Sequence, residues 1–262
     1  MTPGAADPPE RCLRRGRGPL PRGGTKEENT MKKYIDLTLP LIPHWRCMQQ
    51  NDIVEKRSTR RGDSTNVTRF TLQTHWYTHI DAPIHQFAGG KTLNDFPLEY
   101  LFGRATVLDL SYIRDNEPIT ARMLKKALGD DEPTGIILLK TCWEASRGAE
   151  NALRFWQSYD YWDLAPYVTE DGADFLTSLR PHVIGFDFPQ DYDIRKLRLG
   201  VDEKDLYLTT HRHCLKHDIM MIEYMSNLIS LPDVKYVDFV GLPTALENAD
   251  GAQIRCVAVV DE

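Results

Sequence analysis

Short runs of β-branched and aliphatic residues, each bounded by turn-forming residues, recur along this chain and constrain its fold more than any other feature. Such runs predict strands where they are too short for a helix. Helical periodicity is found in only three segments, too few for a regular alternation of strand and helix. We therefore expect an α/β domain with mixed strand order, with strands at residues 67–74, 105–110, 135–140, 183–186 and 254–260 and helices at residues 121–128, 170–179 and 211–217.

The first 30 residues differ from the rest of the chain in composition. They are crowded with Pro, Gly and Arg and contain two Leu as their only large aliphatic residues, so they cannot bury enough surface to offset the entropy of ordering. We expect a disordered tail at residues 1–30 and a single domain at residues 31–262, opening with a strand-like stretch at 34–39. Met31 is accordingly hypothesised to be the natural start of the protein.

The charge balance argues against a nucleic-acid partner. The 262 residues include 32 Lys and Arg against 38 Asp and Glu, a net charge of −6, so no overall positive field attracts a phosphate backbone. No apolar run approaches the roughly 20 residues that a membrane span needs, and the first 30 residues contain no signal-peptide core. We expect a small-molecule substrate and neither a nucleic-acid nor a membrane partner.

The five cysteines are scattered, odd in number and without C-x-x-C spacing, which favours a reducing, cytoplasmic setting. Cys142 or Cys214 could in principle act as a nucleophile beside a histidine. No cysteine-centred motif is found, however, and packing beside His211 is the better interpretation of Cys214.

Candidate metal ligands are concentrated in the stretch Thr-His-Trp-Tyr-Thr-His-Ile-Asp-Ala-Pro-Ile-His at residues 74–85, where three His and one Asp fall within eleven residues. Imidazole nitrogen and carboxylate oxygen bind borderline divalent ions, and a catalytic site needs about three protein ligands with one position left open. We predict a metal site at His75, His79 and Asp81, at the end of the strand 67–74 and in the loop that leaves it. The less favoured alternative is that these are exposed or core histidines without a ligand.

Three further residues of this stretch are candidates for the chemistry. His85 lies four residues beyond Asp81 and titrates near neutrality, so we predict that it is the catalytic general acid and base. Trp76 and Tyr77 lie between two predicted ligands and would favour a flat, apolar substrate. Ordinary core packing explains the two aromatic residues about as well.

A second group of candidate ligands begins at His211 and ends at Glu223. The apolar run at residues 219–222 is typical of a short buried strand, which would place Glu223 at its end. Taken alone this group is weak evidence for a metal site, because the same side chains could be solvated surface residues.

The segment from His75 to His85 resembles the signature H-x-G-T-H-x-D-x-P-x-H of the cyclase family of metal-dependent hydrolases, which includes bacterial kynurenine formamidase and isatin hydrolase. The resemblance extends from about residue 34 to the C-terminus. It implies a mixed β-sheet with a barrel-like β core and outer helices, and association as a homodimer or homotetramer. It also implies that His211 and Glu223 bind or shape the site of one or two ions, and it aligns Trp45 with a substrate-facing aromatic residue.

The sequence departs from the family pattern at several places. Tyr77, Cys142 and Asp218 each stand where glycine is common in the family. The segment Trp45-Arg46-Cys47 stands where formamidases carry Trp-Pro-Gly.

The resemblance implies a metal-dependent hydrolase of a small amide or lactam, in which zinc or manganese activates water for attack on the carbonyl. Two alternatives are kept: a metal-dependent cyclase or dehydratase in a biosynthetic pathway, and a non-catalytic relative that binds a metal or ligand.

Overall fold

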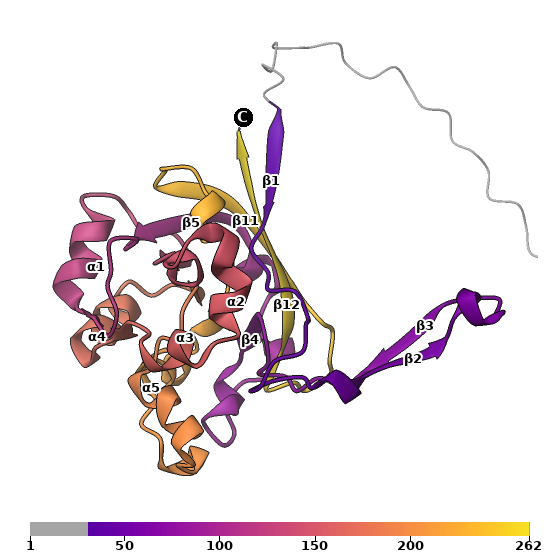
Figure 1. Ribbon diagram of the computed structural model, residues 1–262. Coiled ribbons are helices and arrows are strands. Elements are labelled where there is room, and N and C mark those ends of the chain that lie inside the picture. Colours follow the sequence, from indigo (N-terminus) through magenta and orange to yellow (C-terminus); the bar gives the residue numbers. More distant parts are fainter. Residues whose placement is uncertain (1–30, 262) are drawn as a thin grey trace, which may run out of the picture. The chain divides into compact units, whose positions relative to one another are not determined.

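Seven strands of the computed structural model, which describes residues 31–261, close into a barrel (Figure 1). The strand order is β12, β11, β5, β7, β9, β10 and β4, and pairing of β4 with β12 completes the ring. The pairs β5–β7, β7–β9 and β9–β10 are parallel and the others are antiparallel, which confirms the mixed sheet with a barrel-like core. The strands are β4 (His79–Asp81), β5 (Phe102–Asp109), β7 (Ile136–Lys140), β9 (Val183–Phe186), β10 (Met220–Glu223), β11 (Tyr236–Pro243) and β12 (Gly251–Asp261), with β1 (Lys32–Asp36) added alongside β12.

The strands alternate between two hydrophobic cores because successive side chains of a strand point to opposite faces. In β7, Ile136 and Leu138 belong to one core and Ile137 and Leu139 to the other. The core of Ile136 and Leu138 receives side chains from all seven strands of the ring and therefore fills the barrel. The other core lies between the outer face of the sheet and the helices.

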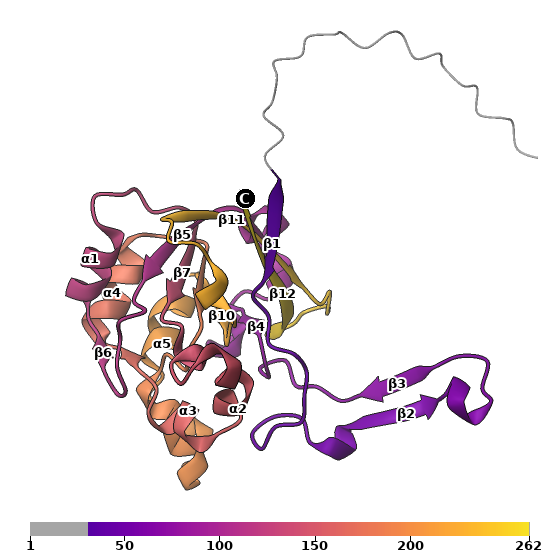
Figure 2. The same ribbon diagram turned by 45° about the horizontal axis from the view of Figure 1, so that its top comes forward.

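The helices pack against one side of the barrel (Figure 2). Helix α4 begins after Thr169, whose hydroxyl accepts a hydrogen bond from the Gly172 amide and so caps the first turn. The α1 helix buries Leu124 and Leu128, one turn apart, in the outer core. The helices are α1 (Ala121–Leu128), α2 (Ala152–Trp156), α3 (Tyr159–Asp163), α4 (Glu170–Ser178) and α5 (Thr209–Lys216).

Two smaller sheets stand apart from the barrel. The pair β6 (Pro118–Ile119) and β8 (Tyr167–Val168) is parallel, and β2 (Ile53–Arg57) with β3 (Val67–Phe70) forms an antiparallel hairpin that extends away from the barrel (Figures 1 and 2). The predicted strand at 67–74 is therefore wrong in its second half. The chain leaves β3 after Phe70 and turns at Gln73, whose carbonyl accepts a hydrogen bond from the Trp76 amide.

Residues from Lys32 onward form one compact unit, and the predicted tail at 1–30 lies outside the described residues. No helix in the described part of the chain is long and apolar enough to cross a membrane.

Candidate metal centre

Strand β4 positions two of the predicted ligands. Ile80 points into the barrel core, so His79 and Asp81, on either side of it, point outward beneath the helices. Strand β10 runs antiparallel to β4, with Glu223 directly opposite His79. Residues directly opposite in an antiparallel pair share a face of the sheet, so Glu223 joins the two ligands of β4. His79 and Asp81 thus lie on a strand of their own and not, as predicted, in the loop after the strand at 67–74, whereas the third predicted ligand, His75, does lie in that loop.

Helix α5 adds His211 over this face. The His211 Nε2 atom lies 3.2 Å from Glu223 Oε1 and 3.4 Å from Asp81 Oδ2. The His79 Nε2 atom lies 3.2 Å from Asp81 Oδ1 and 3.5 Å from Glu223 Oε2. All four side chains are buried, with at most 4% of each residue exposed. The structure therefore brings together four side chains that the sequence places in two distant segments.

These four side chains fit a metal ion. Ligands about 2.1 Å from a tetrahedral ion lie about 3.4 Å from one another, close to the separations observed here. His79 Nε2 and Asp81 Oδ2 are buried and have no hydrogen-bond partner among the described residues, which is costly unless a cation satisfies them. The Nδ1 atom of His79 lies 2.8 Å from the Tyr77 carbonyl and donates to it, which leaves the Nε2 lone pair free for an ion.

His75 and His85 belong to three groups of potential ligands, one of which, with Asp250, lies at the partly exposed edge of the site. His75, His79 and Asp81 bring their ligand atoms within 4.8 Å of one another, and so do Asp81, His85 and His211. Asp81 belongs to both groups, so its carboxylate could bridge two ions. His85 is thus a possible ligand as well as a possible proton acceptor, an option that the sequence analysis missed.

Side chains outside the predicted set hold the candidate ligands in place. The Nδ1 atom of His211 lies 2.6 Å from Asp191 Oδ2, which fixes the ring so that Nε2 faces the other ligands. The Nε2 atom of His75 lies 2.9 Å from Asp250 Oδ2. Gln190 donates a hydrogen bond to Glu223. Sequence reasoning assigned no role to these three partners, because only the fold brings them to the ligands.

Positive charge nearby stabilises the buried carboxylates of this group. Burial alone would lower the pKa of His75, but the carboxylates of Asp81 and Asp250 outweigh it and raise the pKa to about 9. Burial opposes the charged form of Asp81, yet the neighbouring histidines hold the pKa of that carboxyl well below its usual range. Burial lowers the pKa of His85 to about 4, so its imidazole is neutral at neutral pH. A divalent cation bound here would supply the charge that protonated histidines otherwise provide.

The three predicted substrate-binding residues differ in their surroundings. Trp45 and Trp76 are partly buried and pack at the margin of the outer core. Tyr77 is 1% exposed, and its hydroxyl donates a hydrogen bond of 2.5 Å to the Ile42 carbonyl. For Tyr77 the geometry favours core packing, one of the two readings that the sequence left open. The substrate-binding role of all three remains a prediction.

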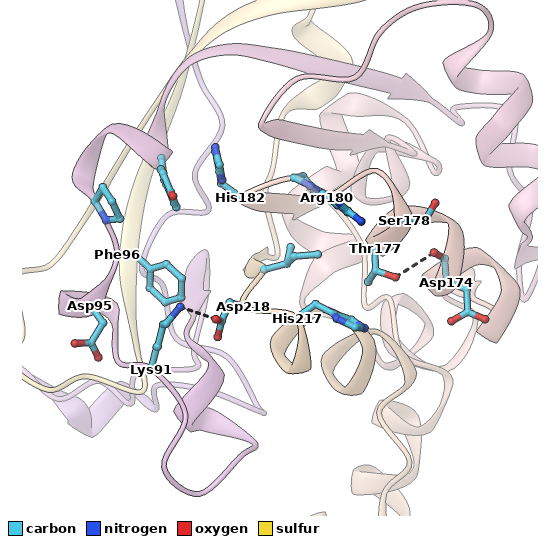
Figure 3. A pocket seen from close by; sticks show the side chains of 14 residues that line it. Lys91, Asp95, Phe96, Asp174, Thr177, Ser178, Arg180, His182, His217 and Asp218 are labelled. Atoms are coloured by element: carbon cyan, nitrogen blue, oxygen red, sulfur yellow. Dashed lines mark hydrogen bonds and ion pairs between the residues drawn. The ribbon is translucent and has the colours of Figure 1, made fainter.

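A pocket of about 690 Å³ lies at the other end of α5, between Lys91 and Arg180 (Figure 3). The Lys91 ammonium group forms an ion pair of 2.5 Å with Asp218 across one side of it, and His182 stacks on Tyr100 with ring centroids 3.7 Å apart. None of the predicted ligands lines this pocket. Its location separates it from the metal centre.

Comparison with known proteins agrees with this architecture. The Cyclase family model matches residues 35–190. Kynurenine formamidase from Bacillus anthracis is 29% identical over 228 residues, which cover 86% of this chain and 96% of that protein. A kynurenine formamidase from a Bacillus cereus strain is 30% identical over 230 residues, with the same coverage.

Solved structures show the same fold. Isatin hydrolase A from Labrenzia aggregata superposes with a TM-score of 0.68 at 20% identity, covering 88% of this chain and 94% of that one. A structure described as a potential metal-dependent hydrolase with cyclase activity has a TM-score of 0.63 at 23% identity and covers 88% and 100%. The resemblance seen in the sequence is thereby confirmed, and this chain belongs to the cyclase family.

Proposed function

We propose that this protein is a metal-dependent hydrolase that opens a small amide or lactam, acting on a C–N bond other than a peptide bond. The observation that carries the proposal is the buried group of His79, Asp81, His211 and Glu223, in which Nε2 of each histidine lies 3.2–3.5 Å from an oxygen of both carboxylates. The names of the relatives, kynurenine formamidase and isatin hydrolase, indicate amide and lactam substrates.

His75, His79, Asp81, His211 and Glu223 would hold one or two ions, for which we favour zinc or manganese. Such an ion supplies Lewis acidity, which polarises a carbonyl and makes water a nucleophile near neutral pH. The chain's own residues then have to move protons and position the substrate.

His85 is suited to the proton transfer. Its ring centroid lies 3.8 Å from that of His75 and 5.6 Å from that of His211, at the edge of the ligand group. Burial lowers its pKa to about 4, below the near-neutral value expected from the sequence, so the imidazole is neutral and free to accept a proton from the attacking water but is a weaker base than predicted. The same ring can pass that proton to the departing nitrogen, which completes a hydrolytic cycle.

We further propose that the protein acts in the cytoplasm, which its scattered cysteines favour, and that it is a homodimer or homotetramer, as the family resemblance implies. Size-exclusion chromatography with light scattering measures the oligomeric state directly.

The proposal is tested by measuring metal content by plasma mass spectrometry together with hydrolysis of N-formylkynurenine and isatin. Wild type and Asp81→Asn are compared, with the exposed Asp205→Asn as a matched control. We expect metal and activity in wild type and Asp205→Asn, and loss of both in Asp81→Asn. Oxygen from labelled water should appear in the product. A metal-loaded wild type that turns over amides without incorporating solvent oxygen would contradict hydrolysis and support the cyclase or dehydratase alternative.

A further inference from the structure

The pocket at the C-terminal end of α5 is a candidate for a second binding site. Its volume of about 690 Å³ is that of a small-molecule site. The Lys91–Asp218 ion pair joins its two walls at one place. At another, the Tyr100 ring stacks on the His182 ring with an angle of 10° between the planes. These two links fix the walls to each other, so the pocket is formed without a ligand.

Two residues of this pocket have a strained backbone. Helices α4 and α5 both end here, and Arg180 and Asp218, which follow them, have φ of 53° and 59°. The Asp218 amide donates to the Leu215 carbonyl and the Ile219 amide to the Cys214 carbonyl, which is a Schellman motif whose left-handed position is usually glycine. Strain of this kind is retained where a side chain is needed. It therefore indicates a function for the two charged side chains in the pocket.

The charged groups of the pocket are unequally satisfied. Each carboxylate that lines it has a donor beside it: Asp95 has the Thr92 amide, Asp174 has His213, and Asp218 has Lys91. The Arg180 guanidinium group forms no ion pair and no hydrogen bond with any residue of 31–261. It lies on the opposite side of the pocket from the Lys91–Asp218 pair (Figure 3). A ligand with an anionic group would supply the acceptor that Arg180 lacks.

Three segments that line the pocket continue into the metal centre. Helix α5 carries His211 in its first turn and ends at the pocket. The turn that follows α5 leads directly into β10, which carries Glu223. On the third segment, the Lys91 carbonyl accepts a hydrogen bond of 3.0 Å from the amide of Ile84, which precedes His85. A ligand that orders these segments therefore acts on the elements that carry the metal centre.

We propose that this pocket binds a small organic carboxylate with an apolar body, and that the bound carboxylate strengthens metal binding at the centre. The planar guanidinium group of Arg180 matches a carboxylate in a bidentate arrangement. Phe96, Pro97 and Ile219 offer apolar surface to the body of the ligand. A phosphate dianion fits less well, because three aspartates and the negative ends of two helices surround the pocket. The effect on the metal rests on the metal centre of the proposed function.

The first test measures binding of hexanoate by calorimetry, with acetate and inorganic phosphate for comparison. Wild type should bind hexanoate at least about tenfold more tightly than either, because only hexanoate buries an alkyl chain. Arg180→Gly removes the guanidinium group and adopts the left-handed conformation without strain. It should fold at least as stably as wild type and bind hexanoate roughly tenfold to a hundredfold more weakly.

Two further variants separate a binding role from a structural one. Asp218→Asn should bind hexanoate about two- to fivefold more tightly, because Lys91 loses its partner while asparagine tolerates the left-handed backbone. Asn248→Gly is the matched control, since Asn248 has φ of 56° and lies outside the pocket, and it should bind as wild type does. Equal hexanoate affinity in Arg180→Gly and the control would overturn the proposal, as would tighter binding of phosphate than of hexanoate.

The second test measures metal affinity by competition with a chromophoric chelator. Saturating hexanoate, compared with acetate at the same concentration, should raise the metal affinity of wild type by about fivefold and leave that of Arg180→Gly unchanged. No difference in wild type would refute the effect on the metal. If the protein takes up no metal, yet wild type binds hexanoate and Arg180→Gly does not, the metal centre of the proposed function fails and the carboxylate site stands.

Discussion

His79 and Glu223 face each other across the antiparallel pair β4–β10, with Nε2 of the histidine 3.5 Å from Oε2 of the glutamate. This register places a ligand from the first third of the chain against one from the last third. A shift of one residue in the pairing would turn Glu223 into the barrel and remove it from the site. The geometry of the centre therefore depends on how the barrel strands pair.

The Asp191 carboxylate is expected to control metal affinity without being among the candidate ligands. It lies 2.6 Å from His211 Nδ1 and also accepts hydrogen bonds from the Thr210 amide and hydroxyl. Asp191→Asn should weaken metal binding by about 10- to 100-fold, because the His211 ring loses its charged partner. Competition with a chromophoric chelator measures the affinity. An affinity equal to that of the exposed Asp205→Asn variant would refute this role.

Gly251 is expected to be required for the position of His75. A Cβ atom at residue 251 would lie 2.7 Å from His75 Cε1 and 2.8 Å from the Ile80 carbonyl oxygen. Gly251→Ala should therefore displace the imidazole, lower the metal content and destabilise the protein by about 1–3 kcal/mol.

The matched control for this substitution is Gly241→Ala on β11, where the added Cβ meets only the side chains of Ile254 and Phe239. It should reduce stability and leave the metal content intact. Denaturant unfolding and metal analysis on both variants make the comparison. Normal metal content in Gly251→Ala would show that the ring can move aside without losing its function.

Removal of the metal should destabilise the protein reversibly. Without an ion, the carboxylates of Asp81 and Glu223 remain buried beside each other and beside His79 and His211. An ion at about 100 times its Kd stabilises the folded state by about 2.7 kcal/mol, which for a chain of this size raises Tm by about 5–10 °C. Thermal melts before chelation, after it and after reloading measure the change. Identical melting curves would show that the group needs no ion for its stability.

Glu144 should make the stability depend on pH in the neutral range. Burial, together with the nearby charge of Asp187, raises the pKa of Glu144 from 4.5 to about 8. Burial raises the pKa of Asp187 itself to about 6, although hydrogen bonds from the Thr141 amide and hydroxyl and from the Cys142 amide favour its charged form. Between pH 4.5 and 8 the folded state binds more protons at Glu144 than the unfolded state, so its contribution to stability falls as pH rises.

Glu144→Gln should remove that dependence above about pH 6, where Asp187 is already charged, and stabilise the protein at pH 8, by an amount on the order of 2 kcal/mol. Glu150→Gln, at an exposed site, is the control and should keep the wild-type slope. Urea unfolding at several pH values distinguishes the two. A wild-type slope in Glu144→Gln would mean that another group carries the proton.

The elements that the sequence predicted best are those whose pattern is local. The strand at 183–186 and the helix at 121–128 have the predicted bounds, because a buried apolar run and an amphipathic repeat are visible in a single segment. Strand β4 has only three residues and forms because it pairs with β10 and β12, so no local sequence pattern predicts it. For the same reason sequence reasoning could name His79 and Asp81 but not the strand that carries them.

The positions where this chain departs from the family's glycines show what sequence can say about the backbone. Tyr77, Cys142 and Asp218 all have positive φ, at 58°, 53° and 59°. Glycine adopts such conformations without cost, whereas other residues do so at about 1–2 kcal/mol. At each of these positions the backbone therefore has the conformation that glycine favours, although the residue is not glycine. The family's glycines at these positions indicate a positive φ from sequence alone. The tertiary contacts that hold Tyr77, Cys142 and Asp218 in that conformation cannot be read from the sequence.

The closing pair β4–β12 joins residues 79–81 to residues 251–253. During synthesis, His79 and Asp81 emerge long before Gly251 exists, and until then β4 has an unpaired edge. Pairing across so long a separation in sequence is slow compared with local folding. Because Asp250 and Gly251 both lie against His75, binding of an ion by the complete group of candidate ligands would be a late event, and metal occupancy would measure whether a newly made chain has closed its barrel.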